Sequence, residues 1–511
     1  MQTSRDETRT ARATIPRAAG SGGRGRRLPR AQAPGDRGGI SRWARPRSGQ
    51  FWTRQFWTGA LLALTAGAAG LGGCADPGPE RPRNVILISV DTLRADRLGC
   101  YGAARETSPA IDALAARGVV FEDATATSPW TLPSHASLFT GLYPSRHGLF
   151  DQQHVLLDEA RPLAETLREA GFATHAIVNA LYVSERFGLG RGFDAYEYLS
   201  EWQVQSDGSR AIVNRGAEIT DDALAYLKGV GESPFFLFLH YYDVHTDLDP
   251  DPTHRQAFAP EYEGAPSGRT DELLRIRREK RPLMPRDVQH LLGLYDAEVR
   301  TLDDQLGRLF AWLEASGRME DTLVVLTSDH GEEWLEHGSL LHGRTYFQEV
   351  IAVPLIFAGA GVPAARRVRD PVSLVDVAPT IQALLGLGVD EGLDGRALQP
   401  LFTDAAAEPR VLFAEADHNN LFQGVKRNGL WCMAREGPWK LKLHRITGVH
   451  YLFHLERDPG ETRDLKSVEP DKAAELLDGL RSFLEEERVA RPVEDALLDE
   501  EERRRQQALG Y

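Results

Sequence analysis

Three uninterrupted apolar runs dominate the sequence, and each ends in side chains that can bind a metal ion. The runs cover residues 85–90, 235–239 and 323–326. Runs that are apolar on both faces are typical of the central strands of a parallel sheet. Asp91 follows the first run, His240 to His245 follow the second, and Asp329 and His330 follow the third. The carboxyl ends of parallel strands share one edge of a sheet, so we expect these polar groups to converge on one site.

Helical patterns at 163–170 and 299–315 alternate with these runs, which predicts an α/β fold with a doubly wound sheet. A further short helix is expected after Thr131, because Pro133 stands near its start and Gly141 at its end. Thr131 then lies where backbone N–H groups and the helix dipole favour an anion. The alternative is that Thr131 only caps this helix, as a single Asp after a strand often does.

The N-terminal region has the composition of an exported leader. Residues 1–73 carry 13 Arg against 3 acidic residues, whereas the whole chain has a net charge of −14. The remainder is therefore strongly acidic, which disfavours a nucleic-acid partner. Residues 55–73 carry no charge and contain a short apolar run, as in a secretory signal; a membrane span of roughly 20 residues is the alternative.

Leu71-Gly-Gly-Cys74 resembles a bacterial lipobox, in which the cysteine is lipidated. We therefore expect 1–73 to be a disordered Arg-rich segment plus a lipoprotein-type signal peptide, followed by a linker at 74–83. The mature protein is expected in the periplasm or on the outer face of the cell envelope, anchored to the membrane by a lipid on Cys74. Only three cysteines are present, so at most one disulfide could form.

The C-terminal region predicts a smaller subdomain. Residues 411–414, 439–443 and 450–453 are short aromatic-rich runs spaced like an antiparallel sheet. We therefore divide the chain into a catalytic domain at 84–400, a small-sheet subdomain at 401–465 and a charged helical tail at 466–511. The charged segment 261–286 is expected to be a solvated insertion, with a lid over the site and a plain loop as alternatives.

Four motifs in order resemble the sulfatase family of the alkaline phosphatase superfamily. They are 84–102 (NVILISVDTLRADRLGCYG), 128–148, 328–333 (SDHGEE) and His342-Gly343. The resemblance implies that family's mixed, mostly parallel sheet and a metal-dependent hydrolase of anionic esters, with a small molecule, a glycan or an envelope lipid as substrate. It places Asp91, Asp329 and His330 on a divalent cation, which could be Ca, Mn, Mg or Zn, with Thr131 as nucleophile and further ligand.

The same resemblance places His245 and His342 on the substrate anion or the leaving oxygen. Arg344 is a substrate-binding candidate beside His342, and His135 is a weaker catalytic candidate. Hard carboxylates and an imidazole are suitable ligands for a cation that clamps a tetrahedral oxyanion.

Departures from the family pattern decide the expected substrate. Sulfatases have Cys or Ser at the position of Thr131, for oxidation to formylglycine, and Arg at that of His135. Threonine cannot give that aldehyde, because its carbinol carbon bears a methyl group. Thr92 also stands where the family has a second acidic residue. We therefore expect phosphate or phosphonate esters rather than sulfate esters. The alternatives are true sulfatase activity, an envelope phospho-headgroup transferase, and a non-catalytic lipoprotein that binds an anion or glycan.

Overall fold

The computed structural model describes residues 81–200, 202–204, 210–212, 215–403, 405–416 and 431–485. Cys74 and the predicted signal segment lie outside these residues. Within them, a nine-stranded sheet has the order β12-β2-β11-β8-β1-β7-β3-β4, with β13 also paired to β2. Its strands are β1 (Asn84–Val90), β2 (Gly118–Thr125), β3 (Ala173–Val178), β4 (Ala195–Tyr198), β7 (Phe235–Tyr241), β8 (Thr322–Ser328), β11 (Ala352–Gly359), β12 (Arg366–Val368) and β13 (Val372–Ser373).

The three apolar runs form β1, β7 and β8, as predicted, and they lie side by side. β1 pairs in parallel with both neighbours, so that Val90 aligns with Tyr241 and with Ser328. β11 is antiparallel to β8 and to β2. The chain between β8 and β11 contains only a small hairpin and one turn of helix, so it returns from the same edge in the opposite direction. The sheet is therefore mixed and mostly parallel.

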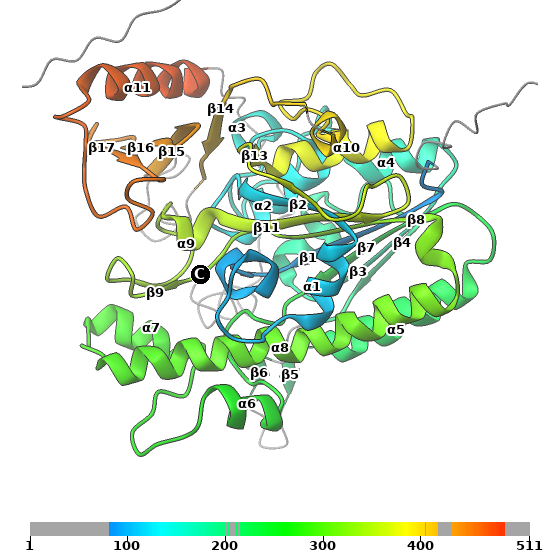
Figure 1. The fold of residues 1–511 in the computed structure, drawn as a ribbon, viewed down its shortest axis with the longest axis horizontal. Helices are drawn as coiled ribbons and strands as arrows, with labels where there is room; N and C mark the ends of the chain where they lie inside the picture. Colours follow the sequence, from blue (N-terminus) through cyan, green and yellow to red (C-terminus); the bar gives the residue numbers. More distant parts are fainter. Residues whose placement is uncertain are drawn as a thin grey trace, which may run out of the picture. The chain divides into compact units, whose positions relative to one another are not determined.

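Helices cover both faces of this sheet (Figure 1). Successive residues of β1 alternate between two cores: Val85 and Leu87 belong to one, Ile86 and Ile88 to the other. The first core includes residues of α2 (Thr131–Thr140), α4 (Leu163–Glu169) and α10 (Val377–Leu384). The second includes residues of α1 (Pro109–Ala116), α5 (Gly216–Gly229) and α8 (Pro285–Ala315). The predicted doubly wound architecture is confirmed, although α8 begins 14 residues before the predicted helix.

Shorter elements complete the described part of the main domain. They are α3 (Pro144–His147), α6 (Pro252–Phe258), α7 (Thr270–Glu279), α9 (Gln348–Ile351), and two hairpins, β5 (Trp202–Val204) with β6 (Arg210–Ile212) and β9 (Glu333–Trp334) with β10 (Leu340–Leu341). Helix α7 lies in the insertion expected at 261–286, and its Leu273 and Ile276 are buried. That insertion is therefore a packed helix over ten of its residues rather than a plain loop.

A separate small sheet has the order β14-β15-β16-β17 and is antiparallel throughout. Its strands are β14 (Val411–Ala414), β15 (Trp431–Glu436), β16 (Trp439–His444) and β17 (His450–His454). Helix α11 (Pro470–Glu485) packs Leu476 and Leu480 onto this sheet, against Cys432 and Leu441. The first half of the expected helical tail is thus amphipathic and covers the small sheet.

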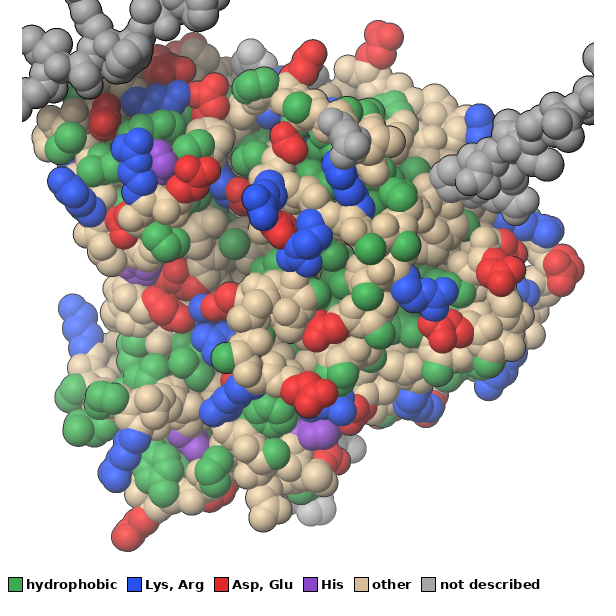
Figure 2. Space-filling view, in the orientation of Figure 1, with side chains coloured by type: hydrophobic (Ala, Val, Ile, Leu, Met, Phe, Trp, Pro, Cys, Tyr) green, Lys and Arg blue, Asp and Glu red, His purple; other side chains and the backbone are tan. Residues whose placement is uncertain are grey.

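Surface charge, helix hydropathy and the state of the cysteines further characterise the described residues. On the face shown in Figure 2, Lys and Arg side chains are interspersed with Asp and Glu side chains. The electrostatic potential of this face is therefore not dominated by charges of one sign. No helix within the described ranges is both long enough and apolar enough to cross a bilayer. Cys100 and Cys432 are both free thiols.

Candidate active site

The ends of β1 and β8 bring Asp91, Asp329 and His330 together. One ligand atom from each residue lies within 4.8 Å of the other two. Nε2 of His330 is 3.3 Å from Oδ2 of Asp329 and 3.9 Å from Oδ1 of Asp91. All three side chains are completely buried. Three of the predicted metal ligands therefore form one cluster, although Asp91 and Asp329 are separated by most of the catalytic domain in sequence.

The donor set of this cluster fits a divalent cation. Among the described residues, neither oxygen of Asp91 nor Oδ2 of Asp329 has a hydrogen-bond partner. Burial raises the pKa of both carboxyls, because it penalises their charged forms. Nδ1 of His330 donates to the carbonyl of Gly331 at 3.0 Å, which leaves the Nε2 lone pair directed at the carboxylates. A bound cation would satisfy these orphaned oxygens and offset their charge.

Thr131 is the first residue of helix α2, as predicted. Its Oγ1 lies 3.4 Å from Nε2 of His330, and the residue is 1% exposed. Within the first turn of α2, Ser134 Oγ donates to the carbonyl of Asp329 at 2.7 Å. The N-terminus of α2 is therefore fixed directly against the cation cluster, and the helix dipole there stabilises negative charge.

His135 lies one helical turn beyond Thr131 and is fully buried. Its Nδ1 donates to the Thr131 carbonyl at 2.9 Å, and its Nε2 is 2.9 Å from Oγ of Ser89. Burial lowers the pKa of His135 to about 4, so the ring is neutral at neutral pH. Both ring nitrogens are engaged, which suits a residue that holds α2 against β1. A direct part for His135 in catalysis stays a prediction.

His245 and His342 line up with His330. The ring centroids of His330 and His342 are 4.5 Å apart, and those of His342 and His245 are 5.0 Å apart. Nδ1 of His245 donates to the carbonyl of Thr246 at 2.6 Å, so Nε2 carries the lone pair. Burial lowers the pKa of His245 to about 3 and that of His342 well below its usual value. Both predicted imidazoles therefore reach the site in the neutral form.

Three further residues lie in this region, and none of them was given an individual role from the sequence. Nε2 of His240 is 3.5 Å from Oδ2 of Asp91, and burial lowers the pKa of His240 to about 4. Glu332 is buried against Nδ1 of His342 at 3.1 Å, and burial raises its pKa to about 8. Arg277 reaches in from α7 and donates to the carbonyl of Leu340 at 3.2 Å. Burial, with the charge of Arg344 nearby, lowers the pKa of Arg277 to about 10.

The sequence carried a signal for two of these residues. His240 stands at the end of the β7 run, and Glu332 lies inside the SDHGEE motif. Arg277 had no such signal, because it comes from an insertion whose packing depends on distant contacts. Arg277 thus places a guanidinium near the site. It comes from the segment 261–286, for which a lid over the site was one of the alternatives.

Thr92 occupies the position at which the resemblance expects a second acid. Its φ of 56° is strained for a β-branched residue. In this conformation its backbone N–H donates to Oδ1 of Asp329 at 3.2 Å. The position thus supplies an amide donor to a ligand carboxylate rather than a further carboxylate.

A second group of acids and histidine, Glu333, His337 and Glu349, has ligand atoms close together. Nδ1 of His337 is 2.5 Å from Glu349 and its Nε2 is 3.0 Å from the carbonyl of Gly460. With both ring nitrogens engaged in this way, His337 has no lone pair for a cation. The ion pair of His337 with Glu349 joins the β9–β10 hairpin to α9, and the hydrogen bond of His337 to Gly460 joins the hairpin to the small subdomain.

Comparisons with known proteins identify the family of the chain. The sulfatase family model matches residues 83–387. Arylsulfatase K of Danio rerio is 24% identical over 460 residues, which cover 81% of this chain and 86% of that protein. The multifunctional alkaline phosphatase superfamily protein PehA of Trinickia caryophylli is 26% identical over 479 residues, covering 75% and 91%.

Solved structures share the fold at lower identity. A protein in complex with its substrate D-glucosamine-2-N,6-O-disulfate superposes with a TM-score of 0.66 at 21% identity, covering 80% of this chain and 98% of that one. A phosphonate monoester hydrolase of Agrobacterium radiobacter gives a TM-score of 0.63 at 22% identity, covering 80% and 95%. The chain belongs to the sulfatase family of the alkaline phosphatase superfamily, and it is a metal-dependent ester hydrolase of that family.

Proposed function

We propose that this enzyme hydrolyses phosphate or phosphonate esters, with Thr131 as the nucleophile. The observation that carries the proposal is the hydroxyl of Thr131, which starts α2 and lies 3.4 Å from Nε2 of His330 beside two buried carboxylates. A threonine at this place cannot be oxidised to formylglycine, so the nucleophile that this side chain can supply is its own hydroxyl. Among the relatives, phosphonate monoester hydrolases support this substrate class.

The chemistry then has two displacements. Bound at Asp91, Asp329 and His330, a divalent cation such as Ca, Mn, Mg or Zn would lower the pKa of a coordinated hydroxyl and neutralise charge on the ester oxygens. Oγ of Thr131 forms a bond to phosphorus, and the bond from phosphorus to the ester oxygen breaks. Water next attacks phosphorus and releases Thr131. As neutral bases, His245 or His342 would take up the proton of the Thr131 hydroxyl and pass it to the leaving oxygen, and a proton of the attacking water then returns to Oγ of Thr131. Glu332 orients the His342 ring through Nδ1.

A sulfate ester would leave Thr131 sulfated, without a geminal hydroxyl to expel the sulfate. We therefore expect kcat/KM for aryl phosphonates or phosphate diesters to exceed that for the matched aryl sulfate at least roughly tenfold, about 1.4 kcal/mol of barrier. The assay is steady-state kinetics on matched esters with the purified enzyme loaded with Mn, Mg, Ca or Zn in turn. Coexpression with a formylglycine-generating enzyme should change nothing.

Sulfatase activity is the second candidate, and the many sulfatases among the relatives favour it. A preference for the sulfate ester in the same assay would establish it and overturn the phosphoester proposal. A headgroup transferase would share every residue named so far, so products must be analysed with water and with alcohol acceptors. Absence of turnover on every ester would favour the non-catalytic lipoprotein.

We also propose that the enzyme works at the cell envelope, tethered through Cys74. The support is the Leu71-Gly-Gly-Cys74 motif after an uncharged apolar run. Native protein should partition with membranes, and Cys74→Ser should release it or leave an uncleaved precursor, whereas Cys100→Ser should behave as wild type. Mass spectrometry that finds an unmodified chain beginning before Cys74 would contradict this proposal.

A further inference from the structure

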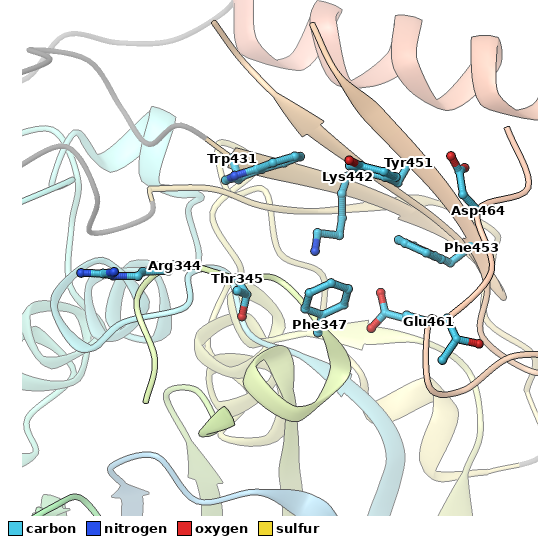
Figure 3. A pocket seen from close by; sticks show the side chains of 10 residues that line it. Arg344, Thr345, Phe347, Trp431, Lys442, Tyr451, Phe453, Glu461 and Asp464 are labelled. Atoms are coloured by element: carbon cyan, nitrogen blue, oxygen red, sulfur yellow. The ribbon is translucent and has the colours of Figure 1, made fainter. Parts of the chain in front are cut away.

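A cavity of about 400 Å³ lies between the small sheet and the segment 344–347 (Figure 3). Strands β15, β16 and β17 contribute Trp431, Lys442 and Tyr451, and Phe347 stands on the opposite side. The volume is in the range of small-molecule sites. Apart from Arg344 at one end, none of its residues has a place in the ester cleavage described above.

Lys442 projects its ammonium group into this cavity, between the rings of Phe347 and Trp431 (Figure 3). Its Nζ lies 3.1 Å from the ring centroid of Phe347 and 5.7 Å from that of Trp431. The residue is only 6% exposed. Within the described part of the chain, no carboxylate lies at ion-pair distance from Nζ. The buried charge is therefore stabilised by aromatic faces rather than by an acid.

The carboxylates around Lys442 are committed to other groups. Burial lowers the pKa of Lys442 to about 7, despite the carboxylates in its vicinity. Glu461 pairs with Lys440 at 2.8 Å and accepts the backbone N–H of Gln348 at 2.7 Å. Glu349 pairs with His337 at 2.5 Å. Glu333 accepts the backbone N–H of Ser339 at 3.0 Å. An anion entering the cavity would thus meet a desolvated amine without an ion-pair partner, and its attraction would favour the protonated form of Lys442.

The rest of the lining suits a ring with one apolar face and polar edges. Trp431 and Tyr451 have ring centroids 6.1 Å apart with planes tilted by 31°, and Tyr451 is 37% exposed. These rings offer a broad apolar surface from one side of the cavity. The rim carries hydrogen-bonding groups from Thr345, Thr462 and Asp464. The hydroxyls of Thr345 and Thr462 donate to Glu333 and Asp458, so their oxygens can still accept hydrogen bonds from the hydroxyl groups of a sugar, which a purely aromatic ring lacks.

We propose that this cavity binds an acidic saccharide unit, with its anionic group on Lys442 and its ring against Trp431 and Tyr451. The anion can be a carboxylate, a sulfate or a phosphate. The site is separate from the Asp91, Asp329 and His330 cluster and does not depend on which ester that cluster cleaves. The saccharide is either a neighbouring unit of the ester substrate or a separate glycan.

The test is direct binding to the full-length, metal-loaded enzyme, measured by calorimetry and by saturation-transfer NMR. The probes are glucuronate, glucose 6-sulfate and glucose 6-phosphate, with methyl glucoside as the neutral control. We expect at least one acidic sugar to bind at least tenfold more tightly than methyl glucoside. Lys442→Met, which keeps the apolar stem, should weaken that binding at least tenfold, while Lys228→Met on the exposed part of α5 should leave it unchanged.

A second variant, Trp431→Leu, keeps the proposal testable if Lys442→Met fails to fold. It changes a partly exposed side chain and should also weaken binding, whereas Lys442→Arg should retain most of it; thermal unfolding checks that each variant is folded. Unchanged affinity in Trp431→Leu or in a folded Lys442→Met would overturn the proposal, and so would equal binding of neutral and acidic sugars.

Thr131→Ala separates this site from catalysis. It should abolish turnover and leave acidic-sugar binding intact, and loss of binding in this variant would assign the sugar to the active site and overturn the cavity proposal. Steady-state kinetics on an aryl ester linked to a glucuronate unit then identify the source of the saccharide. A raised KM in Lys442→Met with kcat unchanged assigns a unit of the substrate, and an unchanged KM with weakened glucuronate binding assigns a separate glycan; both uphold the cavity as a saccharide site.

Discussion

Ser328 links the two loops that carry the metal ligands, and replacing its hydroxyl should weaken metal binding without replacing a ligand. As the last residue of β8, it accepts the N–H of Leu93 at 2.9 Å and donates to the carbonyl of His330 at 2.6 Å. Ser328 is completely buried. Ser328→Ala therefore breaks the bridge between the Asp91 loop and the His330 loop while it leaves all three ligand side chains in place.

The magnitude follows from these two hydrogen bonds. Loss of the bond to the His330 carbonyl costs about 1 kcal/mol, and the buried Leu93 N–H left unpaired costs about 1–3 kcal/mol, so we expect a destabilisation of about 2–4 kcal/mol. Supporting contacts of this kind typically change metal affinity by about 10–100-fold. The loss should thus appear both in the metal-free protein and in the metal dissociation constant.

Calorimetric titration of the chelator-treated enzyme with Mn, together with thermal unfolding in excess chelator, measures both quantities. Ser316→Ala is the matched control, because Ser316 is exposed and its Oγ donates only to the carbonyl of Leu313 at the end of α8. The control should keep wild-type metal affinity. A Ser328→Ala enzyme with unchanged affinity for Mn would refute the reasoning that this bridge positions the ligands.

Two further predictions concern the cluster and the contact between subdomains. Asp329→Asn should lower kcat/KM by several orders of magnitude while circular dichroism stays native, because it removes the charge of one ligand; full activity after chelator dialysis would rule out the site. Asp123→Ala should destabilise the protein by about 2–3 kcal/mol in thermal unfolding, because it leaves the buried Arg435 guanidinium of β15 without its acid. Adding Arg435→Met to Asp123→Ala should restore part of the lost stability. If it restores none, an uncompensated charge on Arg435 is not the cause of the loss.

The strands and their polar ends could be predicted from sequence because the signal is local. A run such as 85–90 is apolar on both faces, and the parallel pairing rule places Asp91 beside the end of β8 without further information. The Thr131 helix was likewise marked at both ends, by Pro133 and by the left-handed Gly141. Where the chemistry follows directly from such local marks, sequence and structure agree.

The remaining features depend on contacts between distant residues. β11 is antiparallel because the chain turns back at the site's own edge, which its apolar composition does not reveal. β15 was missed although it is the second strand of the small sheet; its Arg435 is held by Asp123 of β2, some 300 residues away. Arg277 joins the site only because Leu273 and Ile276 of α7 are buried against the main domain.

The central claim is that Thr131 attacks phosphorus and is then released by water. The stereochemical course at phosphorus tests it without requiring the intermediate to accumulate, because each in-line displacement inverts the configuration. A phosphate diester made chiral with oxygen isotopes, hydrolysed by the metal-loaded enzyme and analysed by phosphorus NMR, should give a product with net retention. Net inversion would mean that water attacks the ester in a single displacement, and it would contradict the assignment of Thr131 as nucleophile.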